Sequence, residues 1–109
     1  MKVKDIAKTL NMKELTNAGC ENEVKTVYTG DLLSRVMADC QEGSAWITVQ
    51  THMNVIAVAE LNDVACVIIP HGIPVEESSL KKANLQGLCM LSSDMDAYEL
   101  CWRIHELLL

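Results

Sequence analysis

Two apolar runs separated by a short polar segment lie near the middle of the chain, within residues 46–59. The first run, residues 46–49, is rich in aromatic and β-branched residues and only a few residues long, which is typical of a strand covered on both faces. The second run, residues 55–59, is too short to span a membrane and has Ala at alternate positions, which favours a helix packed closely on a sheet. This stretch therefore predicts a buried strand, a polar turn and a buried helix.

The same order of apolar run, polar turn and helical pattern occurs four times along the chain. The predicted strands span residues 24–28, 45–49, 64–69 and 88–91, and the helices that follow them are predicted at 32–40, 53–61, 74–86 and 95–107. A short amphipathic helix opens the chain and ends near Asn11, and residues 16–23 form a polar connection. Because such repeated units build parallel sheets, we expect residues 1–109 to form a single α/β domain, with a mostly parallel four-stranded sheet and helices on both faces.

Each predicted strand is followed by a polar turn. In a parallel sheet these turns emerge together at the carboxyl ends of the strands, where open α/β sheets bind their ligands. We therefore predict a pocket for a small molecule or an anion at this edge. The candidate ligand-binding residues are Gly30, Asp31, Gln50, Thr51, His52, Asn54, His71, Gly72, Ser92 and Ser93.

Helix N-termini at these turns supply the predicted chemistry. Thr51 and Ser93 are expected to cap two helices whose free N–H groups then face the ligand, and Gly30 and Gly72 allow close backbone approach. Asp31 is expected to cap the helix that follows it. The alternative is capping alone, since Ser, Thr and Asp precede helices whether or not a ligand is present.

Catalysis and metal binding are the less favoured hypotheses. His52 and His71 share the predicted edge and imidazole ligates metals readily, but the pattern lacks a third ligand, because Asp31 and Asp94 are better explained as helix caps. The chain has no G-x-S-x-G turn, no G-x-x-x-x-G-K-[ST] loop and no G-x-G-x-x-G motif. We therefore predict no catalytic residue and no metal ligand, and a small enzyme using His52 is the least favoured alternative.

Composition and cysteine spacing limit the partners. A net charge of -6 disfavours nucleic acid, and the absence of a signal sequence and of a long apolar run predicts a cytoplasmic protein that does not bind membranes. The five cysteines are widely spaced, with no C-x-x-C pair, which indicates neither a disulfide framework nor a metal site. Cys66 and Cys89 are expected to be buried, and Cys20 is the thiol most expected at the surface.

The last predicted helix has more apolar positions than one contact with a sheet needs. These positions are Tyr98, Leu100, Cys101, Ile104, Leu107 and Leu108. Part of this stripe is expected to face a second copy of the chain in a homodimer, with Ile104 and Leu108 at the contact. His105, on the same helix, is expected to be exposed.

Four segments carry a resemblance to a known family: Y-T-G-D-L-L-S-R-V-M at 28–37, W-I-T-V-Q-T-H-M-N-V-I-A-V-A at 46–59, A-C-V-I-I-P-H-G at 65–72 and L-S-S-D-M-D-A-Y-E-L at 91–100. In this order and spacing they resemble a DRTGG domain, and the resemblance covers nearly the whole chain. Gly30 and Asp31 match the first turn of the family, whereas Thr51 and Gly72 match less closely. The chain has no contiguous D-R-T-G-G string and no Arg in any of the four turns.

The resemblance implies a small α/β domain that regulates or dimerises and is not catalytic, with adenine nucleotides as candidate regulatory ligands by analogy with pyrophosphatases. Domains of this family occur as stand-alone proteins described as related to HPr kinase or associated with iron-only hydrogenases, and as regulatory modules in phosphotransacetylases and pyrophosphatases. We therefore expect a non-enzymatic ligand-sensing domain that forms a homodimer. The alternative is a protein–protein interaction module accessory to an iron-only hydrogenase or another redox enzyme.

Overall fold

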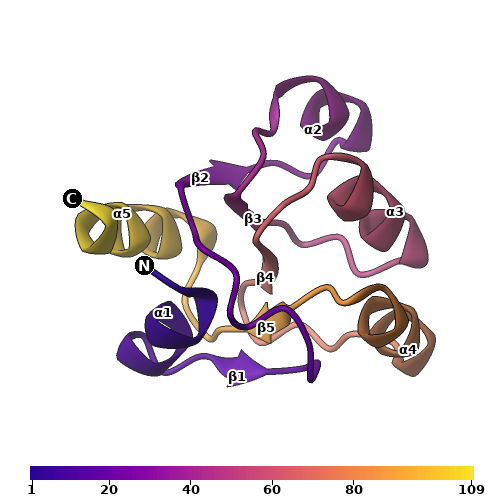
Figure 1. Cartoon of the computed structure of the whole chain (residues 1–109), viewed down its shortest axis with the longest axis horizontal. Coiled ribbons are helices and arrows are strands. Elements are labelled where there is room, and N and C mark those ends of the chain that lie inside the picture. The colour runs from indigo at the N-terminus through magenta and orange to yellow at the C-terminus, as the bar shows by residue number, and fades with distance from the viewer.

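The computed structural model describes all residues from Met1 to Leu109. The strands are β1 (Lys13–Glu14), β2 (Thr26–Thr29), β3 (Ser44–Ile47), β4 (Cys66–Ile69) and β5 (Met90–Ser92). The helices are α1 (Val3–Thr9), α2 (Leu33–Asp39), α3 (Met53–Leu61), α4 (Glu77–Gln86) and α5 (Ala97–Leu108). The five strands form one sheet in the order β1-β5-β4-β3-β2, with helices on both sides (Figure 1).

The sheet is parallel from β2 to β5, as the repeated units predict. The fifth strand, β1, was not expected: it pairs antiparallel with β5, placing Lys13 opposite Ser92 and Glu14 opposite Leu91. Both residues of β1 are exposed, so they show none of the apolar alternation that predicts a strand from sequence. The prediction of a four-stranded sheet is therefore wrong, because it lacks this short edge strand.

Two hydrophobic clusters fill the spaces above and below the sheet, because successive side chains of each strand point to opposite faces. Along β4, Cys66 and Ile68 join the cluster under α1 and α5, and Val67 and Ile69 join the cluster under α2, α3 and α4. Figure 1 shows the same division, with α1 and α5 on one side of the strands and α2, α3 and α4 on the other. The prediction of helices on both faces is confirmed.

Several element boundaries differ from those predicted. The first repeat strand begins at Thr26, two residues later than expected, and α4 begins at Glu77, after the expected start at Pro74. The helix α5 begins at Ala97, because the side chain of Asp96 caps it by accepting a 2.8 Å hydrogen bond from the Glu99 N–H. None of the helices combines the length and the apolar character that crossing a membrane requires.

Candidate functional site

The carboxyl ends of β2, β3, β4 and β5 lie at one edge of the sheet, because these four strands are parallel. The turns after β2 and β3 are joined by Asp31. Its Oδ1 accepts hydrogen bonds from Thr48 Oγ1 and from the Val49 N–H, both at 2.9 Å, and its main-chain carbonyl accepts one from Gln50 Nε2 at 2.9 Å. The side chain of Asp31 therefore orders the neighbouring turn, and the expectation that it caps α2 is wrong: the N-cap of α2 is Leu32, without a side-chain hydrogen bond.

The turns after β4 and β5 are joined through their backbones. The His71 N–H donates to the Met95 carbonyl at 3.0 Å, and the Gly72 N–H donates to the Ser93 carbonyl at 2.8 Å. His71 and Gly72 both have a positive φ of 62°, and a Cβ at Gly72 would lie 3.0 Å from Asp94 Oδ1. Gly72 therefore leaves room for the Asp94 side chain of the same chain, and the predicted close approach of a ligand to this backbone stays a prediction.

Two further predicted helix caps, Thr51 and Ser93, are also wrong. The N-cap of α3 is His52, whose Nδ1 accepts a 3.2 Å hydrogen bond from the Asn54 N–H, and the expected cap, Thr51, instead accepts a bond at its carbonyl from Ser79 Oγ at 2.9 Å. Ser93 does not cap α5, because its Oγ accepts from the Met95 N–H in the turn before that helix. The helix α3 begins at residue 53 as predicted, and its cap is the residue directly before it, whereas α5 begins two residues later than predicted, so its capping position moves to Asp96.

The remaining candidates differ in accessibility. Gln50, His52, Asn54 and His71 are exposed at the edge, whereas Ser92 is a half-buried member of β5. Apart from Thr29, no residue of the four turns lines a cavity, so the exposed side chains among them lie on an open surface, whereas the candidate Ser93 is buried. No group of three or more His, Cys, Asp or Glu side chains is arranged to hold a metal ion.

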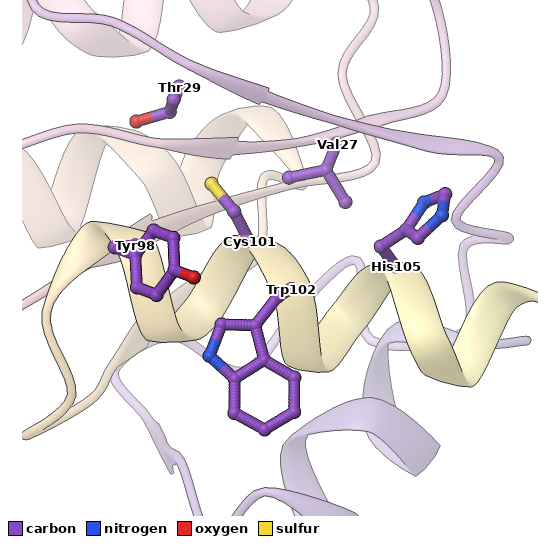
Figure 2. A pocket seen from close by; sticks show the side chains of 6 residues that line it. All are labelled: Val27, Thr29, Tyr98, Cys101, Trp102 and His105. Atoms are coloured by element: carbon purple, nitrogen blue, oxygen red, sulfur yellow. The ribbon is translucent and has the colours of Figure 1, made fainter.

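A groove of about 380 Å³ lies between α5 and β2, the outermost strand on one side of the sheet. Figure 2 shows Val27 and Thr29 of β2 on one side and four residues of α5 on the other, with the Cys101 sulfur directed toward the strand. The α5 residues that line the groove are Tyr98, Cys101, Trp102 and His105. Burial raises the pKa of the Cys101 thiol, although a hydrogen bond with Thr29 acts in the opposite direction. The groove is therefore mostly apolar, with two hydroxyl groups, a thiol and an imidazole along it.

The groove continues along the free edge of the sheet. A second hollow of about 200 Å³ shares Val27 and His105 with it and extends to Lys25 and Leu109. On α5, Tyr98 is 79% exposed and Trp102 is 42% exposed, and the Trp102 ring lies 4.8 Å from the guanidinium carbon of Arg103. His105 is exposed as predicted. The apolar stripe of this helix was the sequence signal for the groove, but its pairing with β2 could not be read from the stripe.

Comparison with solved structures identifies the fold. The chain is similar to the crystal structure of the CBS and DRTGG domains of the regulatory region of Clostridium perfringens pyrophosphatase complexed with its activator, diadenosine tetraphosphate, with a TM-score of 0.73 and 15% sequence identity. The similarity covers 91% of this chain and 44% of that chain. The chain has a DRTGG-like fold. No protein-family model matches it, and no curated protein matches it.

The predicted resemblance of this chain to a DRTGG domain is thus confirmed at the level of the fold. The turn that matches the family most closely, Gly30 and Asp31, is also the turn with the most side-chain hydrogen bonds to a neighbouring turn. The Gly30 carbonyl accepts a 2.9 Å hydrogen bond from Nε1 of the fully buried Trp46, so a core side chain also holds this turn in place. The ten candidate ligand-binding residues stay a prediction.

Proposed function

We propose that the DRTGG-like domain is a regulatory, ligand-sensing domain without catalytic activity, and that its ligand is an adenine nucleotide or a related anion. The observation that carries this proposal is the shared fold with a regulatory region whose crystal structure contains a nucleotide activator. The ordered turns support it, because hydrogen bonds through Asp31 and Ser93 hold the edge in one conformation before any ligand binds. The ligand would lie against Gln50, His52 and His71.

Nucleotide binding should be visible as thermal stabilisation. At 100 times its Kd, a ligand that binds only the folded domain stabilises it by about 2.7 kcal/mol, which raises the melting temperature. We expect this rise with an adenine nucleotide such as diadenosine tetraphosphate, and a smaller rise or none with inorganic phosphate or divalent metals alone. Differential scanning fluorimetry measures it.

A matched pair of variants locates the binding site. His52→Asn removes the imidazole but keeps a side chain that caps helices well, so it should fold and lose the nucleotide-dependent rise. Gln86→Ala changes an exposed residue at the end of α4, next to the opposite edge of the sheet, and should keep the rise. Equal stabilisation of the two variants would show that the ligand does not bind at His52. If no nucleotide stabilises the wild type, the sensing proposal is contradicted.

A second function, self-association, is favoured by the groove between β2 and α5. The edge strand β2 has no charged residue and no proline within Thr26–Thr29, so it lacks the usual protection against pairing with another strand. The Lys25 N–H donates to the carbonyl of Gly43, the residue directly before β3, and backbone groups alternate in direction along a strand. The N–H and C=O groups of Thr26 and Tyr28 therefore point away from the sheet.

A second copy of the chain is the occupant that fits this edge. With β2 antiparallel to itself around an axis at Val27, Thr26 of each copy lies opposite Tyr28 of the other, and the outward groups of both pairs can bond. The same axis brings the exposed Tyr98 and Trp102 of the two α5 helices toward each other, and burying such aromatic rings stabilises interfaces. The other edge strand, β1, has two residues and both are charged, so it is a poorer surface for pairing.

Replacing the exposed indole tests the homodimer. Trp102→Glu places a charge beside the groove of each copy, where the two like charges would face one another, so we expect the variant to sediment as a monomer while the wild type sediments as a dimer. Analytical ultracentrifugation at matched concentrations measures both. Leu85→Glu, which changes an 88% exposed residue on α4, is the control and should stay dimeric. A monomeric wild type would contradict the homodimer and favour a partner protein, such as a redox enzyme, as the occupant of the groove.

A further inference from the structure

Two cysteines that lie far apart in the sequence meet in the folded domain. The Sγ atoms of Cys20 and Cys89 are 3.3 Å apart, although 69 residues separate them along the chain. Cys20 belongs to the connection between β1 and β2, and Cys89 directly precedes β5. Because the S–S bond of a disulfide is about 2.05 Å long, the two atoms need to approach by only about 1.3 Å to reach bonding distance.

The backbone holds the Cys20 connection against β5. Gly19 has a φ of +79°, and a Cβ at this position would lie 2.7 Å from the Cys89 nitrogen and 2.8 Å from the Gly87 carbonyl oxygen, so only glycine fits. On the other side, the Cys20 carbonyl accepts a 2.9 Å hydrogen bond from the Lys4 N–H at the start of α1. The two thiols therefore face each other in the folded state itself and need no rare opening to meet.

The two thiols differ in access to solvent. Cys20 is half-buried and free, whereas Cys89 is completely buried. Burial raises the pKa of the Cys89 thiol, and its contacts with Cys20 and Cys66 raise it further, so this thiol is a poor target for direct attack by a dissolved oxidant. Cys20 is consequently the sulfur that an oxidant reaches first.

We propose that Cys20 and Cys89 form an oxidative modification site, at which hydrogen peroxide converts the thiol pair into an intramolecular disulfide. The Cys20 thiolate attacks the peroxide, a sulfur–oxygen bond forms, the oxygen–oxygen bond breaks and hydroxide leaves. The Cys89 sulfur then attacks the Cys20 sulfenic acid, the sulfur–sulfur bond forms, and the hydroxyl group leaves as water with the Cys89 proton. The two thiols lose two electrons in total, and one peroxide is reduced.

The disulfide would join the connection before β2 to the strand that ends at the predicted ligand-binding edge. A link between residues so far apart closes a long loop, which restricts the unfolded chain strongly. We expect the oxidised domain to melt about 10 °C higher than the reduced domain, and dithiothreitol to reverse the change. Oxidation would thereby link the connection between β1 and β2 covalently to the start of β5.

The test treats the fully reduced, full-length chain with an equimolar amount of hydrogen peroxide and then alkylates the remaining thiols in denaturant. Intact-mass and peptide mass spectrometry should show all cysteines alkylated except Cys20 and Cys89, which should appear as one cross-linked peptide pair in the monomer. Cys20→Ser changes a half-buried position and should fold, yet form no bond and show no reversible rise in melting temperature. Cys89→Ala should give the same result.

Cys101→Ser is the matched control, since Cys101 is also half-buried but has no sulfur neighbour within hydrogen-bonding distance. This variant should form the disulfide as the wild type does. The proposal is overturned if all thiols stay alkylatable after peroxide treatment, if Cys20 stops at a sulfinic acid while Cys89 stays reduced, or if Cys20 bonds only to Cys20 of another chain.

Discussion

Ile104→Glu should unfold the domain, whereas Trp102→Glu on the same helix should leave it folded. Ile104 has no exposed surface and belongs to the cluster that also contains Ile47 and Ile68 of the sheet. That cluster contains no charged side chain, so the new carboxylate would be buried without a partner. We expect a loss of more than about 4 kcal/mol, a large part of the stability of a small domain.

Circular dichroism and urea denaturation at pH 7 measure the difference between the two variants. Trp102 is 42% exposed, so the carboxylate of Trp102→Glu can stay in water and the helix should keep its native signal. A folded Ile104→Glu variant with native-like stability would contradict the position of α5 on the sheet. The expectation that Ile104 lies in a dimer contact is wrong, because its fully buried side chain packs against its own sheet. The exposed aromatic side chains of α5 are Tyr98, a member of the predicted stripe, and Trp102, which is not.

The sequence predicts the parallel part of the fold well, for a physical reason. The central strands are buried on both faces, so they appear in the sequence as short, mostly apolar runs separated by polar turns. The buried run from Val64 to Ile69 is the clearest case. The strand β1 cannot be predicted in this way, because both of its residues are exposed. Its position depends on hydrogen bonds that Leu15 and Thr16 make with the distant β5.

The site is harder to predict than the fold. The sequence gives the order of the turns, and the parallel sheet brings their strands to one edge, but it does not give the partners of individual polar groups. Asp31 could cap its own helix or bond to another turn, and only the structure distinguishes the two, through its contacts with Thr48 and Val49. The contact between Cys20 and Cys89 has the same origin, since no local pattern links residues that meet only through tertiary packing.

The second large effect is a loss of stability in alkaline solution under reducing conditions. Burial raises the pKa of the Cys66 thiol to about 12, and burial also raises that of Cys89. An unfolded cysteine has a pKa of about 8.5, so above this pH the unfolded chain releases thiol protons that the native domain still holds. The unfolded state then binds fewer protons, and the free energy of unfolding falls as the pH rises.

Each of these thiols should lower the free energy of unfolding by about 1.4 kcal/mol per pH unit between roughly pH 9 and pH 11. Urea denaturation at several pH values, with reductant present, measures this slope. Cys66→Val removes one titrating group from the core and should reduce the slope by that amount, whereas Met90→Leu repacks the neighbouring strand, keeps every thiol and should leave the slope unchanged. The same slope in Cys66→Val and in the wild type would show that ionisation of Cys66 does not limit stability, and the alkaline sensitivity would then have to arise elsewhere in the molecule.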